Sequence, residues 1–118
     1  MFRVNLLSGM FLVLSVMSGQ VLANHSCGGV VTRVDVDANG VVFASIASVG
    51  DSLRVCSLTE KLGMFNSTAC NASFSLLLSA KVTSSKVKLW FNNDSEPDCY
   101  KGSWGDMTVH GLYHIRYE

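Results

Sequence analysis

Histidine, acidic and cysteine side chains are the residues of this chain that could carry out chemistry, and their spacing limits what that chemistry is. His110 and His114 stand four residues apart with Leu112 between them, so on one strand face they could bind a metal ion. An exposed strand face explains the same spacing more simply. No nucleophile elbow accompanies either histidine, and the sequence predicts no Ser-His-Asp catalysis and no enzyme.

Three acidic residues, Asp94, Glu96 and Asp98, alternate in one polar stretch. Carboxylate oxygens suit calcium, but this stretch lacks the glycine and the distal glutamate of an EF-hand loop. A solvated acidic loop is therefore the interpretation we favour. We expect neither a bound metal nor another cofactor.

The four cysteines, Cys27, Cys56, Cys70 and Cys99, show no CxxC spacing, and no histidine lies at a zinc-ligand distance from them along the chain. An even number of cysteines in an exported chain predicts disulfides, for which three pairings are possible. We interpret them as structural staples of a small core.

Export is expected from residues 1–23, which read as a secretory signal peptide: Arg3 near the start, an apolar run, and Ala23 at the cleavage position. The apolar run is too short and too polar for a membrane span. Residues 24–118 then form one domain that is secreted or periplasmic. Without Arg3 this domain has eight basic and nine acidic residues, a balance that excludes the broad basic surface of nucleic-acid binders.

Exposed aromatic residues are the best candidates for binding. Trp104 lies between glycines in an irregular stretch near Tyr100, where it could stack on a sugar ring or enter a partner's pocket. The alternative is that Trp104 folds back over one end of the domain. Trp90 and Phe91 are adjacent on a predicted strand, so one of them must face outward.

The hydrophobic pattern predicts five strands and one short helix in the order β-β-β-α-β-β. An Asn39-Gly40 turn joins the first two strands, and Asn71 is expected to cap the helix. The helical stripe of positions i, i+3, i+4 and i+7 is Phe74, Leu77, Leu78 and Lys81, with Leu76 and Ala80 beside it. The expected strands cover 29–36, 41–46, 53–56, 87–91 and 108–117, with a loop at 92–99 and a bulge at Gly111. This order is that of an OB-fold, a mainly β, five-stranded Greek-key barrel.

Two stretches of the chain, 72–80 and 87–91, resemble the helix and fourth strand of the subtilase-cytotoxin and typhoid-toxin B subunits, and Gly29-Val30-Val31 resembles their first strand. The 13 residues between Cys56 and Cys70 are similar to the spacing of a disulfide in that family. The resemblance therefore implies the pairs Cys56–Cys70 and Cys27–Cys99. It also implies an exported OB-fold that assembles into a pentameric ring and binds cell-surface glycans.

Two positions depart from that family. Gly28 stands where the family has a glycan-contacting serine, and Phe91 stands where it has a tyrosine, so both sugar-bonding hydroxyl groups are missing. We therefore expect a non-enzymatic binding module with Trp104, Tyr100, Phe91 and Gly28 as candidate ligand contacts. The alternative is a secreted or periplasmic domain that contacts a protein partner along a sheet edge and binds no glycan.

Overall fold

The protein, seen in a computed structural model that describes residues 23–118, is mainly β with five antiparallel strands and one α-helix. The predicted signal peptide lies outside the described residues, apart from Ala23. The elements follow one another in the predicted order, with a short 3-10 helix, η1, added before the last strand. They are β1 (Ala23–Val36), β2 (Val41–Ile46), β3 (Gly50–Ser57), α1 (Ser67–Val82), β4 (Lys86–Asp94), η1 (Met107–His110) and β5 (Leu112–Tyr117).

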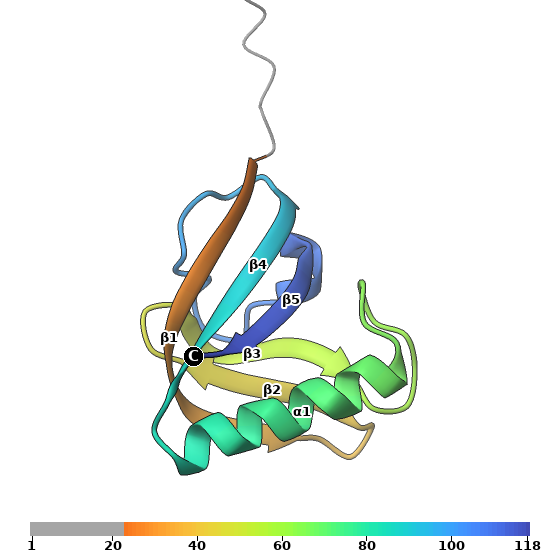
Figure 1. Ribbon diagram of the computed structural model, residues 1–118. Helices are drawn as coiled ribbons and strands as arrows, with labels where there is room; N and C mark the ends of the chain where they lie inside the picture. Colours follow the sequence, from red (N-terminus) through yellow and green to blue (C-terminus); the bar gives the residue numbers. More distant parts are fainter. Residues whose placement is uncertain (1–22) are drawn as a thin grey trace, which may run out of the picture.

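The long strand β1 connects the two halves of the sheet, whose strand order is β3-β2-β1-β4-β5. Its first half pairs with β4 and its second half with β2, and the register shifts at Val31 and Arg33. Figure 1 shows β1 curving from its run beside β4 to its pairing with β2 near α1. A Cβ at Gly29 would lie 1.9 Å from the carbonyl oxygen of Ala47, so only glycine allows this crossing.

The two ends of the sheet, β3 and β5, are not paired with each other, so the described strands form an open sheet, and the barrel of the expected OB-fold stays a prediction. Instead, the segment that follows Cys99 lies along the outer edge of β3. It forms parallel bridges from Ser103 to Asp51 and from Asp106 to Arg54. The edge of β3 is thus covered by loop backbone rather than by a strand.

Helix α1 begins five residues earlier than predicted, because Asn66, not Asn71, is its N-cap and accepts a hydrogen bond from the amide of Ala69. The disulfide between Cys56 of β3 and Cys70 of α1 fixes the rotation of the helix. Its buried face is Cys70, Ser73, Leu77 and Ala80, whereas Leu78 and Lys81 of the predicted stripe are exposed.

The last predicted strand is shorter than expected, since residues 107–110 form η1. Gly111 is not a bulge in that strand; it ends η1 in the left-handed conformation, with φ 72°. A Cβ there would lie 1.9 Å from the carbonyl oxygen of Asn92. Residues 92–94, predicted as loop, extend β4 instead, and this extension carries Asp94 into the interior.

Candidate functional site: a buried carboxylate and the loop it anchors

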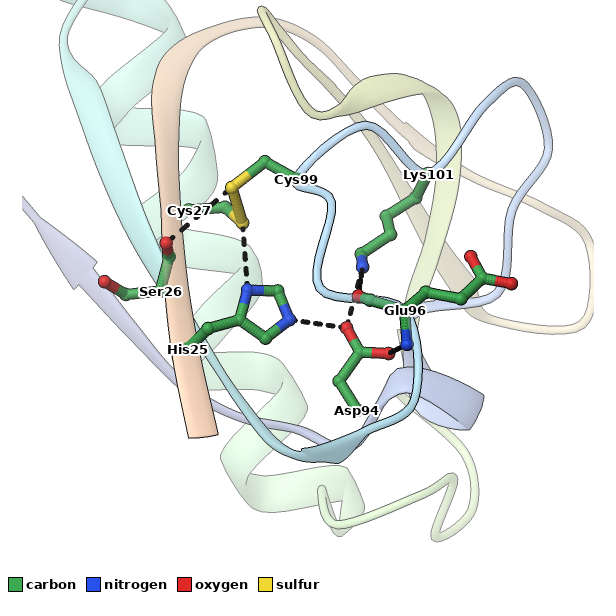
Figure 2. Close-up of a disulfide and its surroundings, with 7 residues drawn as sticks. All are labelled: His25, Ser26, Cys27, Asp94, Glu96, Cys99 and Lys101. Atoms are coloured by element: carbon green, nitrogen blue, oxygen red, sulfur yellow. Dashed lines mark hydrogen bonds and ion pairs between the residues drawn. A yellow bond between two sulfur atoms is a disulfide. The ribbon is translucent and has the colours of Figure 1, made fainter. Parts of the chain in front are cut away.

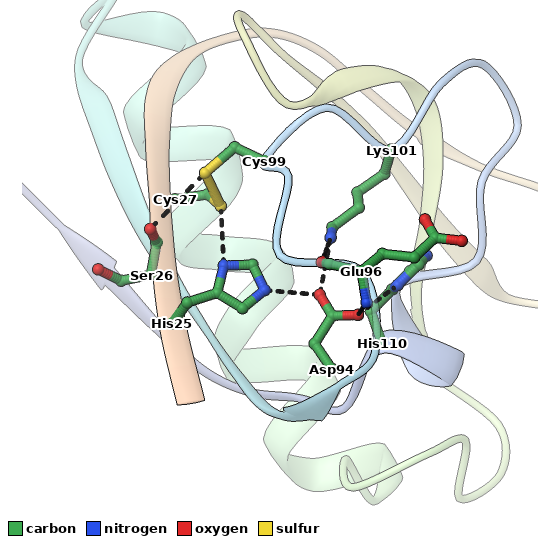
Figure 3. Close-up of polar contacts among 8 residues, drawn as sticks. All are labelled: His25, Ser26, Cys27, Asp94, Glu96, Cys99, Lys101 and His110. Carbon is green, nitrogen blue, oxygen red and sulfur yellow. Dashed lines mark hydrogen bonds and ion pairs between the residues drawn. A yellow bond between two sulfur atoms is a disulfide. The ribbon is translucent and has the colours of Figure 1, made fainter. Parts of the chain in front are cut away.

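The carboxylate of Asp94 is the centre of a buried polar cluster, shown in Figures 2 and 3. Lys101 Nζ donates to its Oδ2 at 2.7 Å, and His25 Nε2 donates to the same oxygen at 2.6 Å. His110 Nδ1 donates to Oδ1 at 2.9 Å, and the amide of Glu96 donates to that oxygen at 3.0 Å. We call Asp94, Lys101, His25, His110 and the Glu96 backbone the Asp94 cluster.

The cluster joins parts of the chain that are far apart in sequence. His25 comes from the start of β1, Asp94 from the end of β4, Lys101 from the following loop and His110 from η1. The side chains of Asp94 and Lys101 are completely buried. Lys101 Nζ also donates to the carbonyl of Glu96 at 2.8 Å, so the ammonium has protein partners in place of water.

The aromatic ring of Phe91 supports the cluster from the core. His25 stacks on it with 5.1 Å between ring centroids, and His110 meets it edge-on at 6.5 Å. Lys101 Nζ lies 5.2 Å from the ring centroid, within cation–π range. Phe91 is fully buried, so it is not available to contact a ligand as the resemblance implied.

Burial and hydrogen bonding act in opposite directions on Asp94. Burial by itself raises the pKa of the carboxyl group, but the hydrogen bonds from Lys101, His110, His25 and the Glu96 amide together outweigh it. The pKa of Asp94 is held well below its usual range. The carboxylate and the Lys101 ammonium therefore form an ion pair whose opposite charges compensate each other inside the protein.

The geometry of the cluster favours a structural role over catalysis. An ionised carboxylate can only accept, so both imidazoles carry their proton on the nitrogen that faces Asp94. The other nitrogen of His25 lies 3.5 Å from Cys27 Sγ, and that sulfur is bonded to Cys99. His25, Cys27 and Cys99 offer metal-ligating atoms within 4.8 Å of one another, but in the disulfide neither sulfur is a thiolate.

The loop between Asp94 and η1 is fixed to the domain along most of its length. Both disulfides favoured from the resemblance are present, and Cys27–Cys99 ties this loop to β1. Beyond Lys101 the loop backbone is bonded to β3 and the turn before it, on both sides of Trp104. The bonds run from Lys101 N to Val49 O, Asp51 N to Gly102 O, Trp104 N to Asp51 O, and Arg54 N to Gly105 O, with distances of 2.6–3.0 Å.

This rigid loop presents two of the predicted aromatic residues to solvent. Trp104 is 73% exposed and Tyr100 is 67% exposed. Trp104 touches the ring of Phe43 edge-on at 5.8 Å, but it does not fold back over the domain. Its φ of 59° places a non-glycine residue in the left-handed region, a conformation that costs roughly 1 kcal/mol and must be imposed by its surroundings.

The remaining predicted site residues lie elsewhere. Gly28 lies on β1 opposite Lys88 of β4, and the hollow that it lines includes neither Trp104 nor Tyr100. The prediction that His110 and His114 lie on one face of the same strand is wrong. His110 belongs to η1 and the Asp94 cluster, whereas His114 lies on β5 against Trp90.

The acidic stretch is also only partly as expected, because Asp94 is not solvated. The added residues of β4 place its carboxylate among buried donors, while Glu96 and Asp98 are exposed. His25 and Lys101 were not anticipated. A signal for them existed in the favoured Cys27–Cys99 pair, since His25 precedes Cys27 by two residues and Lys101 follows Cys99 by two.

Comparisons with protein family models, with curated proteins and with solved structures find no match for this chain. Among the described residues, no helix is long and apolar enough to cross a membrane.

Proposed function

We propose that the protein is an exported, non-enzymatic binding module that contacts its ligand, a cell-surface glycan, through the aromatic loop 95–106. The observation that carries this proposal is the exposure of Trp104 on a rigid backbone. Its side chain is 73% exposed, its φ lies in the left-handed region, and the loop backbone before and after it is hydrogen-bonded to β3 and the preceding turn. A large apolar side chain so exposed adds little to folding. In a rigid loop, however, it binds without an ordering cost.

A sugar suits this surface because pyranose rings stack on indole and phenol rings, and their hydroxyl groups bond nearby polar groups. Tyr100 and Trp104 supply two such rings. The OB-fold and the likeness to toxin B subunits remain part of the proposal. They are supported by the element order, by β1 pairing with both β2 and β4, and by the loop that bridges toward β3. Two disulfides are consistent with an oxidising compartment outside the cytoplasm.

The test is binding to a glycan array by the disulfide-bonded protein and by its Trp104→Ala variant. We expect the parent to bind and Trp104→Ala to lose at least about tenfold in affinity, because a buried aromatic contact is a typical hot spot. Val82→Ala, which truncates an equally exposed residue at the end of α1, should bind like the parent. No binding by the parent would remove the glycan proposal.

The pentameric ring is a separate part of the proposal, and it is tested by mass in solution. Light scattering of the disulfide-bonded protein should give about five times the mass of one chain. A mass of about 10 kDa, that of one domain of this length, would exclude the ring.

A protein partner bound along a sheet edge is the second candidate, and the outer edge of β5, which pairs with no other described strand, favours it. The edge of β3 is covered by loop backbone, but Glu118 donates to Lys86 across the β4–β5 pair, so the amides of Ile115 and Tyr117 point away from β4. An added strand could bond there. A partner of this kind should remain bound in excess free sugar and should be lost on Ile115→Pro, with folding checked by circular dichroism.

A further inference from the structure

The outer face of the β1–β4–β5 part of the sheet carries a tryptophan surrounded by cations. Trp90 of β4 points outward, opposite to the buried Phe91. The Arg116 guanidinium lies 4.7 Å from the centroid of its ring, and Lys88 Nζ lies 5.4 Å from it. His114 meets the ring edge-on at 4.9 Å. Stacking on Trp90 orients the planar guanidinium so that it can pair with an anion at little entropic cost.

A β-bulge places a second aromatic ring beside this group. The consecutive residues Trp90 and Phe91 oppose His114 and Leu112, so Tyr113 is the extra residue of β5. Tyr113 and His114 are consequently both exposed, although neighbours in a regular strand face opposite sides. Trp90, Tyr113, His114 and Arg116 line a hollow of about 230 Å³.

A second hollow, of about 250 Å³, lies next to the first on the same sheet. It is lined by Gly28, Gly29, Lys86, Val87, Lys88 and Glu118. In the strand register Gly28 lies opposite Lys88, and Lys88 lies opposite Arg116. Because Gly28 has no side chain, the space beside Lys88 stays open. Lys88 and Arg116 therefore stand between two hollows, each large enough for part of an extended ligand.

The charge of this face differs from that of the domain as a whole. The domain has eight basic and nine acidic residues, yet the residues around the two hollows comprise three cations, Lys86, Lys88 and Arg116, and one acid, Glu118. Glu118 accepts from Arg116 Nη2 at 3.1 Å, and both side chains of this pair are about half exposed. Such a surface pair is worth little and yields readily to a stronger anion.

We infer that this face, the Trp90 face, binds an acidic polysaccharide. A sugar ring would occupy the hollow beside Tyr113, and carboxylate or sulfate groups of successive sugars would pair with Arg116, Lys88 and Lys86. Two adjacent hollows with cations between them fit a linear chain with repeated anions. Three cations in a domain of net negative charge are too few for the phosphate contacts of a nucleic-acid binder.

The Trp90 face is independent of the glycan contact proposed for Trp104, because the two hollows share no residue with loop 95–106. The two proposals can therefore fail separately. Trp104→Ala should leave binding at the Trp90 face unchanged.

The experiment measures binding of the disulfide-bonded protein to two immobilised probes, heparin for sulfate and polygalacturonate for carboxylate, at 0.15 M salt. We expect the triple variant Lys86→Gln/Lys88→Gln/Arg116→Gln to lose more than about thirtyfold in affinity. Arg116→Lys keeps the charge but loses the planar guanidinium that can form two parallel hydrogen bonds to an anion, and it should lose about fivefold. The matched control, Arg33→Gln/Lys61→Gln/Lys81→Gln, removes three exposed cations from other surfaces and should bind within about twofold of the parent.

Tyr113 distinguishes sugar recognition from simple charge attraction. Tyr113→Phe should bind like the parent and Tyr113→Ser should lose about fivefold, because only the serine removes the ring. The inference is overturned if the parent binds neither probe, or if the control triple variant loses as much as the Trp90-face triple variant. It is also overturned if polyglutamate, anionic vesicles or single-stranded DNA bind as tightly as the polysaccharides.

Discussion

Paired acidic and basic residues have different roles in the Asp94 cluster and on the Trp90 face. In the Asp94 cluster, Lys101 is completely buried and both oxygens of Asp94 are fully engaged, so the charges hold a loop and reach no ligand. On the Trp90 face, Arg116 is half exposed and its partner Glu118 is easily displaced. The difference shows that burial and partner number, rather than residue type, separate a structural charge from a binding one.

Removing the Cys27–Cys99 disulfide, which ties the loop of the Asp94 cluster to β1, should have the largest effect on stability. Cys27→Ser/Cys99→Ser opens a loop with a sequence separation of 72, and the chain-entropy model gives a loss of about 4 kcal/mol. Cys56→Ser/Cys70→Ser, with a separation of 14, should cost about 3 kcal/mol. Urea unfolding of both variants measures the order, and a larger loss from the Cys56–Cys70 pair would contradict the account.

Breaking the buried ion pair should come next. Lys101→Met leaves the Asp94 carboxylate buried without its cation and should cost about 3 kcal/mol of unfolding free energy. Arg116→Met removes a cation of the same sign from the Trp90 face and should cost less than about 0.5 kcal/mol. Equal losses in the two variants, measured by urea unfolding at pH 7, would remove the distinction between the regions.

Acid should weaken the buried region through Asp94. Its pKa is lower in the folded protein than its usual value of about 3.9 in an unfolded chain, so the unfolded state takes up the proton first as the pH falls. The stabilisation is complete above about pH 5 and is lost progressively as the pH falls below about 4. Asp94→Asn should be less stable at pH 7 and should lose less stability between pH 5 and pH 3. Parallel pH profiles for parent and variant would contradict this assignment.

The strands, the helix and the 39–40 turn could be predicted because their signals are local, in the alternation of apolar residues and the Asn39-Gly40 pair. The helix start could not be predicted, since Asn66 and Asn71 are the same residue type and either can cap a helix; in the structure Asn66 is the cap and Asn71 lies inside the helix. Trp104 and Tyr100 could be predicted because both lie in an irregular stretch of the sequence, in which Gly102 and Gly105 flank Trp104, and the structure leaves both side chains exposed.

The Asp94 cluster is a product of tertiary structure. Asp94 is one of three alternating acids, and only the extension of β4 separates it from its exposed neighbours. The Trp90 face was missed for a similar reason. Its two hollows depend on the pairing of Gly28, Lys88 and Arg116 across three strands and on the bulge at Tyr113.

Amide hydrogen exchange of the native, disulfide-bonded protein tests the central claim most directly, namely that the buried cluster and the Cys27–Cys99 bond hold the aromatic loop in one conformation. The amides of Lys101 and Trp104 donate to Val49 and Asp51, so both should be strongly protected in the parent and should exchange much faster in Lys101→Met. Exchange in the parent at the rate of an unstructured peptide would contradict the account.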